Sequence, residues 1–442
     1  MRQIATLLVL LAVLPGCDLT RQVVQEVVAA AEDAATPSVP DEMTADPADC
    51  TDGQASAFDC GNVDMVARIS LAGFGEGSTR GNDIWGWTDP QTGTEYALVG
   101  LNDGTGFVSL ADPENPAVLG KLPTATESST WRDIKVYAGH AYIGSEAPGH
   151  GIQVFDLARL RGMSADAGRT LTADTRYTGV GSSHNVVIDE QSGFLYAVGA
   201  VSQGDALPAA CDAKGFHAVD IREPMNPTFS TCFSDAAIET GPRTPGYTHD
   251  AQCLVYDGPD ADYVGRQVCL AANEDVLTIF DVEDKSDVKI ISVGEYPLDA
   301  YSHQVWLSDD QRYAFLNDEL DEMNGNVATQ RTLVFDLEDL DNPEFDFAWD
   351  SGLPVIDHNL YIKDGYMYQS NYMSGLRIID ISRVSEGVLT EAAFFDTFPQ
   401  DQKVGFGGQW SNFPYFDSGL VVANDGKNGF FVLRPNLNRL GS

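Results

Sequence analysis

The chain has 442 residues, and its 66 acidic and 26 basic residues give a net charge of −40 at pH 7 with histidine neutral. Nucleic acids and anionic membrane surfaces would repel so acidic a protein, so we expect neither as a partner. The acidity fits a solvated surface adapted to high salt, where counter-ions screen the self-repulsion, or a surface that binds cations such as calcium.

Residues 1–16 have the pattern of a secretory signal peptide. Arg2 precedes an apolar run, residues 4–13, that is too short to span a bilayer as a mature helix. The sequence Leu14-Pro15-Gly16-Cys17 then resembles the lipobox of bacterial lipoproteins, in which the cysteine becomes the acylated N-terminus. We therefore expect export to the bacterial cell envelope or surface and a lipid anchor on Cys17. The alternative is an ordinary signal peptide followed by a chance cysteine.

Residues 17–49 differ in composition from the rest of the chain. After the expected lipidated Cys17 they are rich in Ala, Glu, Asp, Val and Pro, and they contain no aromatic residue. Such a segment cannot bury enough apolar surface to order itself. We interpret it as a disordered tether that holds a folded domain, residues 50–442, away from a membrane surface.

Six cysteines remain when Cys17 is set aside, and an exported chain meets oxidising conditions. The absence of any Cys-x-x-Cys arrangement leaves zinc ribbons and thioredoxin-like motifs without support. We expect three local disulfides, with free buried thiols as the alternative. The expected pairs are Cys50 with Cys60, Cys211 with Cys232, and Cys253 with Cys269.

Short runs of apolar, β-branched and aromatic residues separated by Asp, Asn and Gly recur along the rest of the chain, which is typical of antiparallel strands. They form a repeat of roughly 40–50 residues with several strands in each copy, the signature of propeller blades. Asn-Pro turns after several third strands, as at Asn342-Pro343, indicate an outer edge strand. We predict an all-β, seven-bladed β-propeller with four-stranded antiparallel blades. The seven copies open at Asp83, Trp131, Ser183, Thr248, Ser302, Asp357 and Gln409.

Several of these runs also carry a family resemblance. Residues 378–382 (Ile-Ile-Asp-Ile-Ser), 335–337 and 216–221 look like LVIVD repeats. Residues 247–253 (Tyr-Thr-His-Asp-Ala-Gln-Cys) and 316–322 (Leu-Asn-Asp-Glu-Leu-Asp-Glu) resemble the bacterial choice-of-anchor B family. The resemblance covers roughly residues 50–433 and implies an exported surface propeller with a lipid anchor; it implies no activity.

Four of the seven histidines open the first strand of a blade, which lines the central channel of a propeller. Carboxylates on the same edge would join them, and imidazole with carboxylate suits a divalent metal such as zinc, manganese or iron. The alternative is that each histidine hydrogen-bonds a neighbouring blade's backbone or carboxylate and closes the ring. The expected metal or ligand residues are His184, His249, His303, His358, Asp250, Glu274, Asp318 and Glu319, with Asp133, Glu146, Asp357 and Asn371 on the same edge.

The expected function is a non-enzymatic, monomeric surface scaffold that binds a ligand or partner, a surface protein or a saccharide, through the histidine face with a metal at the channel mouth. A metal-dependent hydrolase or lyase at the channel is the alternative, and a passive interaction module is a third hypothesis. A Ser-His-Asp triad is excluded at Ser183-His184 and Ser302-His303, because neighbours on a strand point to opposite faces. His150, between two glycines, is expected to be exposed, and the tryptophans near the first strands are expected to pack in the core.

Overall fold

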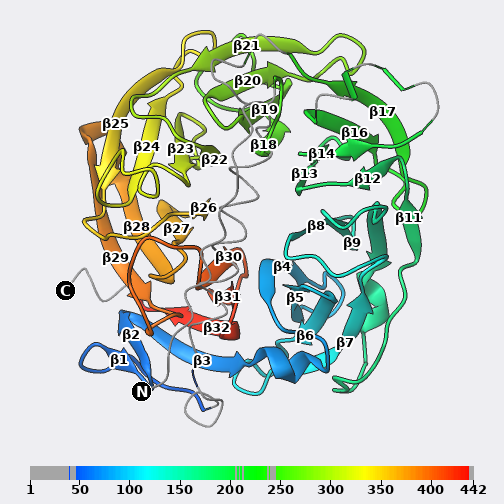
Figure 1. The fold of residues 1–442 in the computed structure, drawn as a ribbon, viewed down its shortest axis with the longest axis vertical. Coiled ribbons are helices and arrows are strands. Elements are labelled where there is room, and N and C mark those ends of the chain that lie inside the picture. The colour runs from blue at the N-terminus through cyan, green and yellow to red at the C-terminus, as the bar shows by residue number, and fades with distance from the viewer. Residues whose placement is uncertain are drawn as a thin grey trace, which may run out of the picture.

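The computed structural model describes residues 39, 46–204, 207–208, 210–211, 214–235, 238 and 245–437. In this part of the chain the protein is a seven-bladed β-propeller, with antiparallel sheets arranged as a ring around a central channel (Figure 1). The predicted fold class is therefore confirmed. The expected signal peptide, Cys17 and most of the expected tether lie outside the described residues.

Six blades each contain four strands, which follow one another in sequence from the channel to the rim. In blade three, one short strand between the second and third strands in sequence belongs to another sheet. Blades one to three are β4 (Gly81–Thr88), β5 (Glu95–Leu101), β6 (Gly104–Ser109) and β7 (Ala117–Pro123); β8 (Arg132–Tyr137), β9 (His140–Ser145), β10 (Ile152–Asp156) and β11 (Thr175–Tyr177); β13 (Asn185–Asp189), β14 (Phe194–Val198), β16 (Phe216–Asp220) and β17 (Thr228–Phe233). Blades four to six are β18 (Asp250–Val255), β19 (Gln267–Ala272), β20 (Leu277–Asp281) and β21 (Lys289–Gly294); β22 (Ser302–Leu307), β23 (Tyr313–Asp318), β24 (Arg331–Asp336) and β25 (Glu344–Asp350); β26 (Asn359–Lys363), β27 (Tyr366–Ser370), β28 (Leu376–Arg383) and β29 (Val388–Phe395).

The seventh blade joins the two ends of the ring. It contains β30 (Gln409–Phe413), β31 (Val421–Asp425) and β32 (Gly429–Pro435), and its outer strand is β3 (Val63–Ile69), which lies beside β32 in Figure 1. The short strands β1 (Gln54–Ala55) and β2 (Phe58–Gly61) extend the rim of blade six through β29. The ring closure and this extension were not predicted, because the sequence repeats show only three strands in the last copy.

Short elements complete the described chain. A two-stranded sheet pairs β12 (Val180–Ser182) with β15 (Val201–Ser202). Three single-turn 3-10 helices are η2 (Leu71–Phe74), η3 (Leu157–Leu160) and η5 (Val384–Glu386). No helix among the described residues is long and apolar enough to cross a membrane.

All three predicted disulfides are present, and each ties neighbouring parts of one blade or hairpin. Cys253 and Cys269 face each other on β18 and β19. Cys211–Cys232 attaches the segment before β16 to β17, and Cys50–Cys60 closes the hairpin next to blade six. Three disulfides are typical of a chain that folds in an oxidising compartment.

Burial along the strands follows their place in the ring. Every residue of the second strands β5 and β23 is buried, because blades cover both of their faces. The outer strand β25 instead alternates between exposed and half-buried residues, as expected of an edge. Apolar and aromatic side chains fill the space between blades, such as Phe107 and Phe155, whose ring centroids lie 4.6 Å apart.

A candidate metal centre at the mouth of the central channel

An arc of four imidazoles lines one end of the channel. His303 is the second residue of β22, and the other three histidines directly precede β13, β18 and β26. Because these positions are equivalent in four consecutive blades, the rings lie side by side, each tilted by 45–46° to the next. The centroid distances are 4.2 Å for His184–His249, 4.3 Å for His249–His303 and 4.4 Å for His303–His358. The predicted convergence of the histidines is therefore observed, and we call these four residues the histidine arc.

Two histidines of the arc hydrogen-bond the next blade through Nδ1. His249 Nδ1 lies 2.9 Å from the carbonyl oxygen of His303, and His358 Nδ1 lies 2.5 Å from that of Trp410. A carbonyl oxygen only accepts, so Nδ1 carries the proton and the neutral ring keeps its lone pair on Nε2. The ring-closing bonds expected as the alternative to metal binding are thus present, and they leave Nε2 in the state that a metal requires.

His184 differs from the rest of the arc. Its Nδ1 lies 2.5 Å from Glu146 Oε1. Burial alone would lower the pKa of His184, but the hydrogen bond and charge of Glu146 outweigh it and raise that pKa. His184 therefore differs from the other three imidazoles in having a carboxylate partner.

Glu319 brings a carboxylate to the arc from the loop after β23. Its Oε2 lies 3.8 Å from His303 Nε2 and its Oε1 lies 3.9 Å from His358 Nε2. One ligand atom from each of these three residues lies within 4.8 Å of the others. Ligand atoms around a four-coordinate zinc lie about 3.3 Å apart, so the three side chains would have to move closer together to bind one ion. The Tyr372 hydroxyl donates to Glu319 Oε1 at 2.6 Å and fixes the carboxylate.

The charge states of these groups suit a cation. Burial and the neighbouring imidazoles hold the pKa of His303 well below its usual range, and burial lowers the pKa of His358 to about 3. Both rings are therefore neutral at physiological pH. Burial raises the pKa of Glu319 to about 7, and it outweighs the hydrogen bond from Tyr372 and the charge of His184, which both lower that pKa.

Asp250 lies deeper in the channel than the arc. It belongs to a charged layer with Lys135, whose Nζ is 2.6 Å from Asp133 Oδ1 and 3.7 Å from Asp83 Oδ2. The ammonium group also lies 4.6 Å from the centre of the Trp85 ring. Burial, with the nearby charge of Asp133, raises the pKa of Asp250 to about 7.

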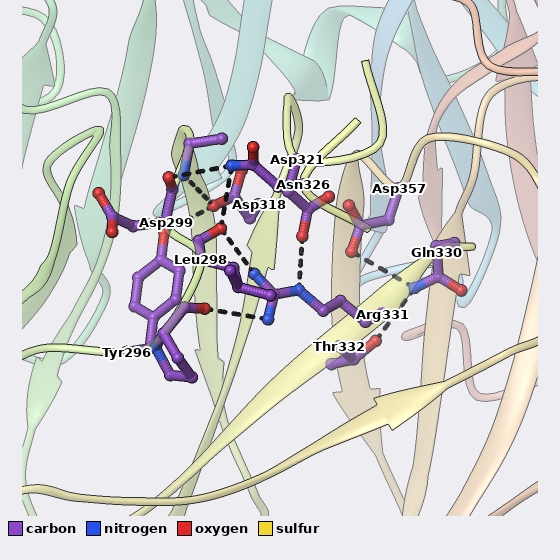
Figure 2. Close-up of polar contacts among 12 residues, drawn as sticks. Tyr296, Leu298, Asp299, Asp318, Asp321, Asn326, Gln330, Arg331, Thr332 and Asp357 are labelled. Carbon is purple, nitrogen blue, oxygen red and sulfur yellow. Dashed lines mark hydrogen bonds and ion pairs between the residues drawn. The ribbon is translucent and has the colours of Figure 1, made fainter. Parts of the chain in front are cut away.

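Two other predicted ligands lie away from the arc's Nε2 atoms. Asp318 accepts hydrogen bonds from the Tyr296 hydroxyl and from the backbone N–H groups of Ala300 and Tyr301, so both of its oxygens are occupied (Figure 2). Glu274 interacts with the Tyr301 side chain, and its backbone pairs with Ser302. Asp318 and Glu274 therefore shape the loops around the arc.

Beyond the charged layer the channel opens into a cavity of about 680 Å³. A narrow space of about 20 Å³, lined by His184, His303 and Asp250 among others, lies between the arc and this cavity. Trp85, Trp87 and Trp306 line the large cavity while also packing in the core. The channel is thus polar at the arc and partly aromatic at the other end.

His150 is buried, contrary to the expectation that its flanking glycines would leave it exposed. Its side chain has no exposed surface, and Nε2 lies 3.1 Å from Arg132 Nη1. Burial and the charge of Arg132 lower the pKa of His150 to about 4. Arg132 precedes Asp133 as His249 precedes Asp250, so Arg132 takes the place of an arc histidine in blade two, and His150 is buried against it.

Comparison with known proteins supports the fold and goes no further. No known protein family matches the chain, and no curated protein sequence is significantly similar to it. The β-propeller domain of Cps50 (Swd1) from Myceliophteria thermophila has a TM-score of 0.53 at 12% identity, over 84% of this chain and 98% of that chain. A protein from Lactobacillus plantarum has a lower TM-score of 0.48 at 16% identity, over 79% of this chain and 89% of that chain. The periplasmic gluconolactonase PpgL from Pseudomonas aeruginosa has a TM-score of 0.45 at 11% identity, over 72% of this chain and 84% of that chain.

Proposed function

We propose that this protein is an exported surface propeller that binds one divalent transition-metal ion through His303, His358 and Glu319 and holds a ligand at the channel. The observation that carries the proposal is the convergence of these three donors within 4.8 Å. The Nδ1 bond of His358 to a carbonyl, which frees Nε2, supports it. Two imidazoles and one carboxylate suit zinc, manganese or iron.

For the ligand we propose a saccharide or a segment of another surface protein that enters the channel. The cavity of about 680 Å³ falls within the usual range of small-molecule sites. Trp85, Trp87 and Trp306 offer aromatic surface on which a sugar ring can stack. The net charge of −40 disfavours nucleic acid, and we propose that the propeller acts as a monomer.

For the location we propose export and a lipid anchor on Cys17, in keeping with the resemblance to LVIVD-repeat proteins of the choice-of-anchor B family. The three disulfides support an oxidising compartment. The test is mass spectrometry of the N-terminal peptide from expressing cells. A diacylated or triacylated Cys17 that is lost in Cys17→Ala, with release of the protein from membranes, supports the anchor. An unmodified N-terminus elsewhere contradicts it.

A second candidate function is a metal-dependent hydrolase or lyase. The donor set favours it, because two histidines and one carboxylate leave a fourth position of a tetrahedral metal open for water. A structural zinc site would instead be closed by four protein ligands. Cobalt substitution separates the two: a visible spectrum that shifts when azide is added indicates an open position, and an unresponsive spectrum indicates a closed one.

The proposal is tested by elemental analysis of the full protein after dialysis, with and without prior chelation. We expect about one transition-metal ion per chain, which is lost in His303→Ala and Glu319→Gln. His140→Ala is the matched control, because His140 begins β9 away from the histidine arc and its Nδ1 hydrogen-bonds the carbonyl oxygen of the nearby Ala138. Metal content that is unchanged in His303→Ala would overturn the proposal.

A further inference from the structure

We propose that the channel cavity binds the end of a saccharide chain that carries a free amine, and that Asp250 binds this amine. This preference for a cationic sugar rests on the proposed function, which places a saccharide in the cavity. The cavity, of about 680 Å³, is lined in part by residues 135–139, 187–191 and 306–309. These segments lie at the ends of β8, β13 and β22, whose beginnings lie at the histidine arc, so the cavity occupies the other end of the channel.

The cavity is closed toward the arc. The space between the cavity and the arc measures about 20 Å³, which is room for about one water molecule. A sugar ring cannot pass through it, so a ligand must enter and leave by the same mouth. A blind cavity of this kind takes the end of a chain and not its middle.

Acidic side chains dominate the charge of the lining. Among the residues that line the cavity, Lys135 is the one base, and its ammonium group already binds Asp133 and Asp83. A confined space with walls of low dielectric concentrates the field of its charges. The lining therefore attracts cations and repels anions. The acidic residues of the lining are Asp189, Glu190, Asp250 and Asp309.

Asp250 offers the ligand a buried acceptor. The residue is 9% exposed, and its Oδ1 accepts the N–H of Ala251 at 2.8 Å. No donor in the described part of the chain reaches Oδ2, because the nearby Lys135 donates to Asp133 instead. A buried carboxylate oxygen without a donor is unfavourable. An ammonium group on the ligand supplies both a donor and the opposite charge.

Two amide groups favour a sugar over the side chain of a basic peptide. Gln252 Oε1 accepts the N–H of Leu307 at 2.8 Å, and Gln304 Oε1 accepts that of Leu360 at 2.5 Å. Both residues line the cavity, and within the described chain nothing accepts from their Nε2 atoms. Gln252 also shares a strand face with Asp250, two residues before it. An amino sugar has hydroxyl oxygens beside its amine to accept from these donors, whereas the tip of a lysine side chain has none.

The aromatic part of the lining suits both the ring and the charge of such a ligand. The Trp85 ring lies 5.1 Å from that of Phe413 and 6.4 Å from that of Tyr415, and all three residues line the cavity with Trp306. The apolar face of a sugar ring packs on aromatic surface of this kind. Lys135 Nζ lies 4.6 Å from the centre of the Trp85 ring, so the protein already places one ammonium group against this wall.

The test is calorimetry of the full protein with three linear tetramers, of glucosamine, N-acetylglucosamine and glucose. The three share their ring skeleton, but only the glucosamine tetramer carries ammonium groups. We expect it to bind at least tenfold more tightly than the other two. Titrations at physiological salt screen attraction to the acidic surface, and tetralysine serves as a cationic probe without sugar rings.

Asp250→Asn keeps the shape of the side chain and removes its charge. We expect it to reduce the preference for the glucosamine tetramer at least tenfold while leaving binding of the glucose tetramer unchanged. Asp341→Asn is the matched control, because it makes the same change of charge at an exposed residue outside the cavity. His303→Ala should lose the transition metal and keep sugar binding, which separates failure of the metal centre from failure of this site.

Equal affinity for the three tetramers would overturn the amine preference and leave the proposed saccharide in place. The absence of binding by any tetramer would overturn both. A preference that persists in Asp250→Asn would contradict the role of this carboxylate. Tetralysine that binds as tightly as the glucosamine tetramer would assign the cavity to a basic peptide and overturn the proposal.

Discussion

The Nδ1 atom of His249 donates to the carbonyl oxygen of His303, the next histidine of the arc. One bond thereby ties blade four to blade five and fixes the tautomer of the imidazole. The same relationship between His358 and Trp410 ties blade six to blade seven. Ring closure and metal binding, which the sequence presents as alternatives, use different nitrogen atoms of the same side chain.

Metal affinity should depend on pH through Glu319. Burial raises its pKa to about 7, whereas the pKa of His358 lies near 3. Below pH 7 a proton on Glu319 competes with the metal, so affinity should fall about tenfold per pH unit and level off above pH 7. Equilibrium dialysis with zinc at pH 5.5 to 8 measures this. If two protons were taken up for each metal ion released, beginning near pH 6.5, the histidines would be titrating in place of Glu319.

Tyr372→Phe should weaken zinc binding while leaving the fold intact. The Tyr372 hydroxyl donates to Glu319 Oε1 at 2.6 Å and lowers the pKa of that carboxyl against the effect of burial. Loss of such an outer partner costs about 10-fold to 100-fold in metal affinity. The variant should also move the pH dependence of binding to higher pH. Unchanged affinity and pH dependence would show that Tyr372 does not position Glu319.

Lys135→Met should destabilise the protein strongly. The ammonium group is the cation that offsets the buried carboxylates of Asp133 and Asp83. Its removal leaves them without a counter-charge, which costs about 3–5 kcal/mol for a buried pair. Chemical denaturation measures the change in unfolding free energy. Lys289→Met, which breaks the exposed pair with Asp287, is the control and should have a much smaller effect.

Replacement of Cys253 and Cys269 by serine should lower the unfolding free energy by about 3 kcal/mol, the loop-entropy value for a closed loop of this length. The bridge spans a sequence separation of 16 residues and links the first two strands of blade four. Denaturation of the double variant with and without a reducing agent measures it. A variant as stable as the oxidised protein would contradict the expectation.

Sequence periodicity was enough to predict the seven blades and the convergence of the histidines, because strand alternation and turns repeat at a fixed spacing. It did not predict that β3 completes the seventh blade, since pairing of Val63 with Pro435 is a contact between chain ends and leaves no periodic trace. The sequence also placed Asp318 and Glu319 together as expected ligands. Only the fold shows that backbone N–H groups occupy Asp318, while Glu319 turns toward His303 and His358.

A transition-metal ion is proposed to bind in the space between His303, His358 and Glu319. Crystals of the protein loaded with one equivalent of zinc, measured on both sides of the zinc absorption edge, test it most directly. We expect one anomalous peak about 2.0–2.2 Å from both Nε2 atoms and from a carboxylate oxygen of Glu319. No peak there, with zinc bound elsewhere or not at all, would contradict it.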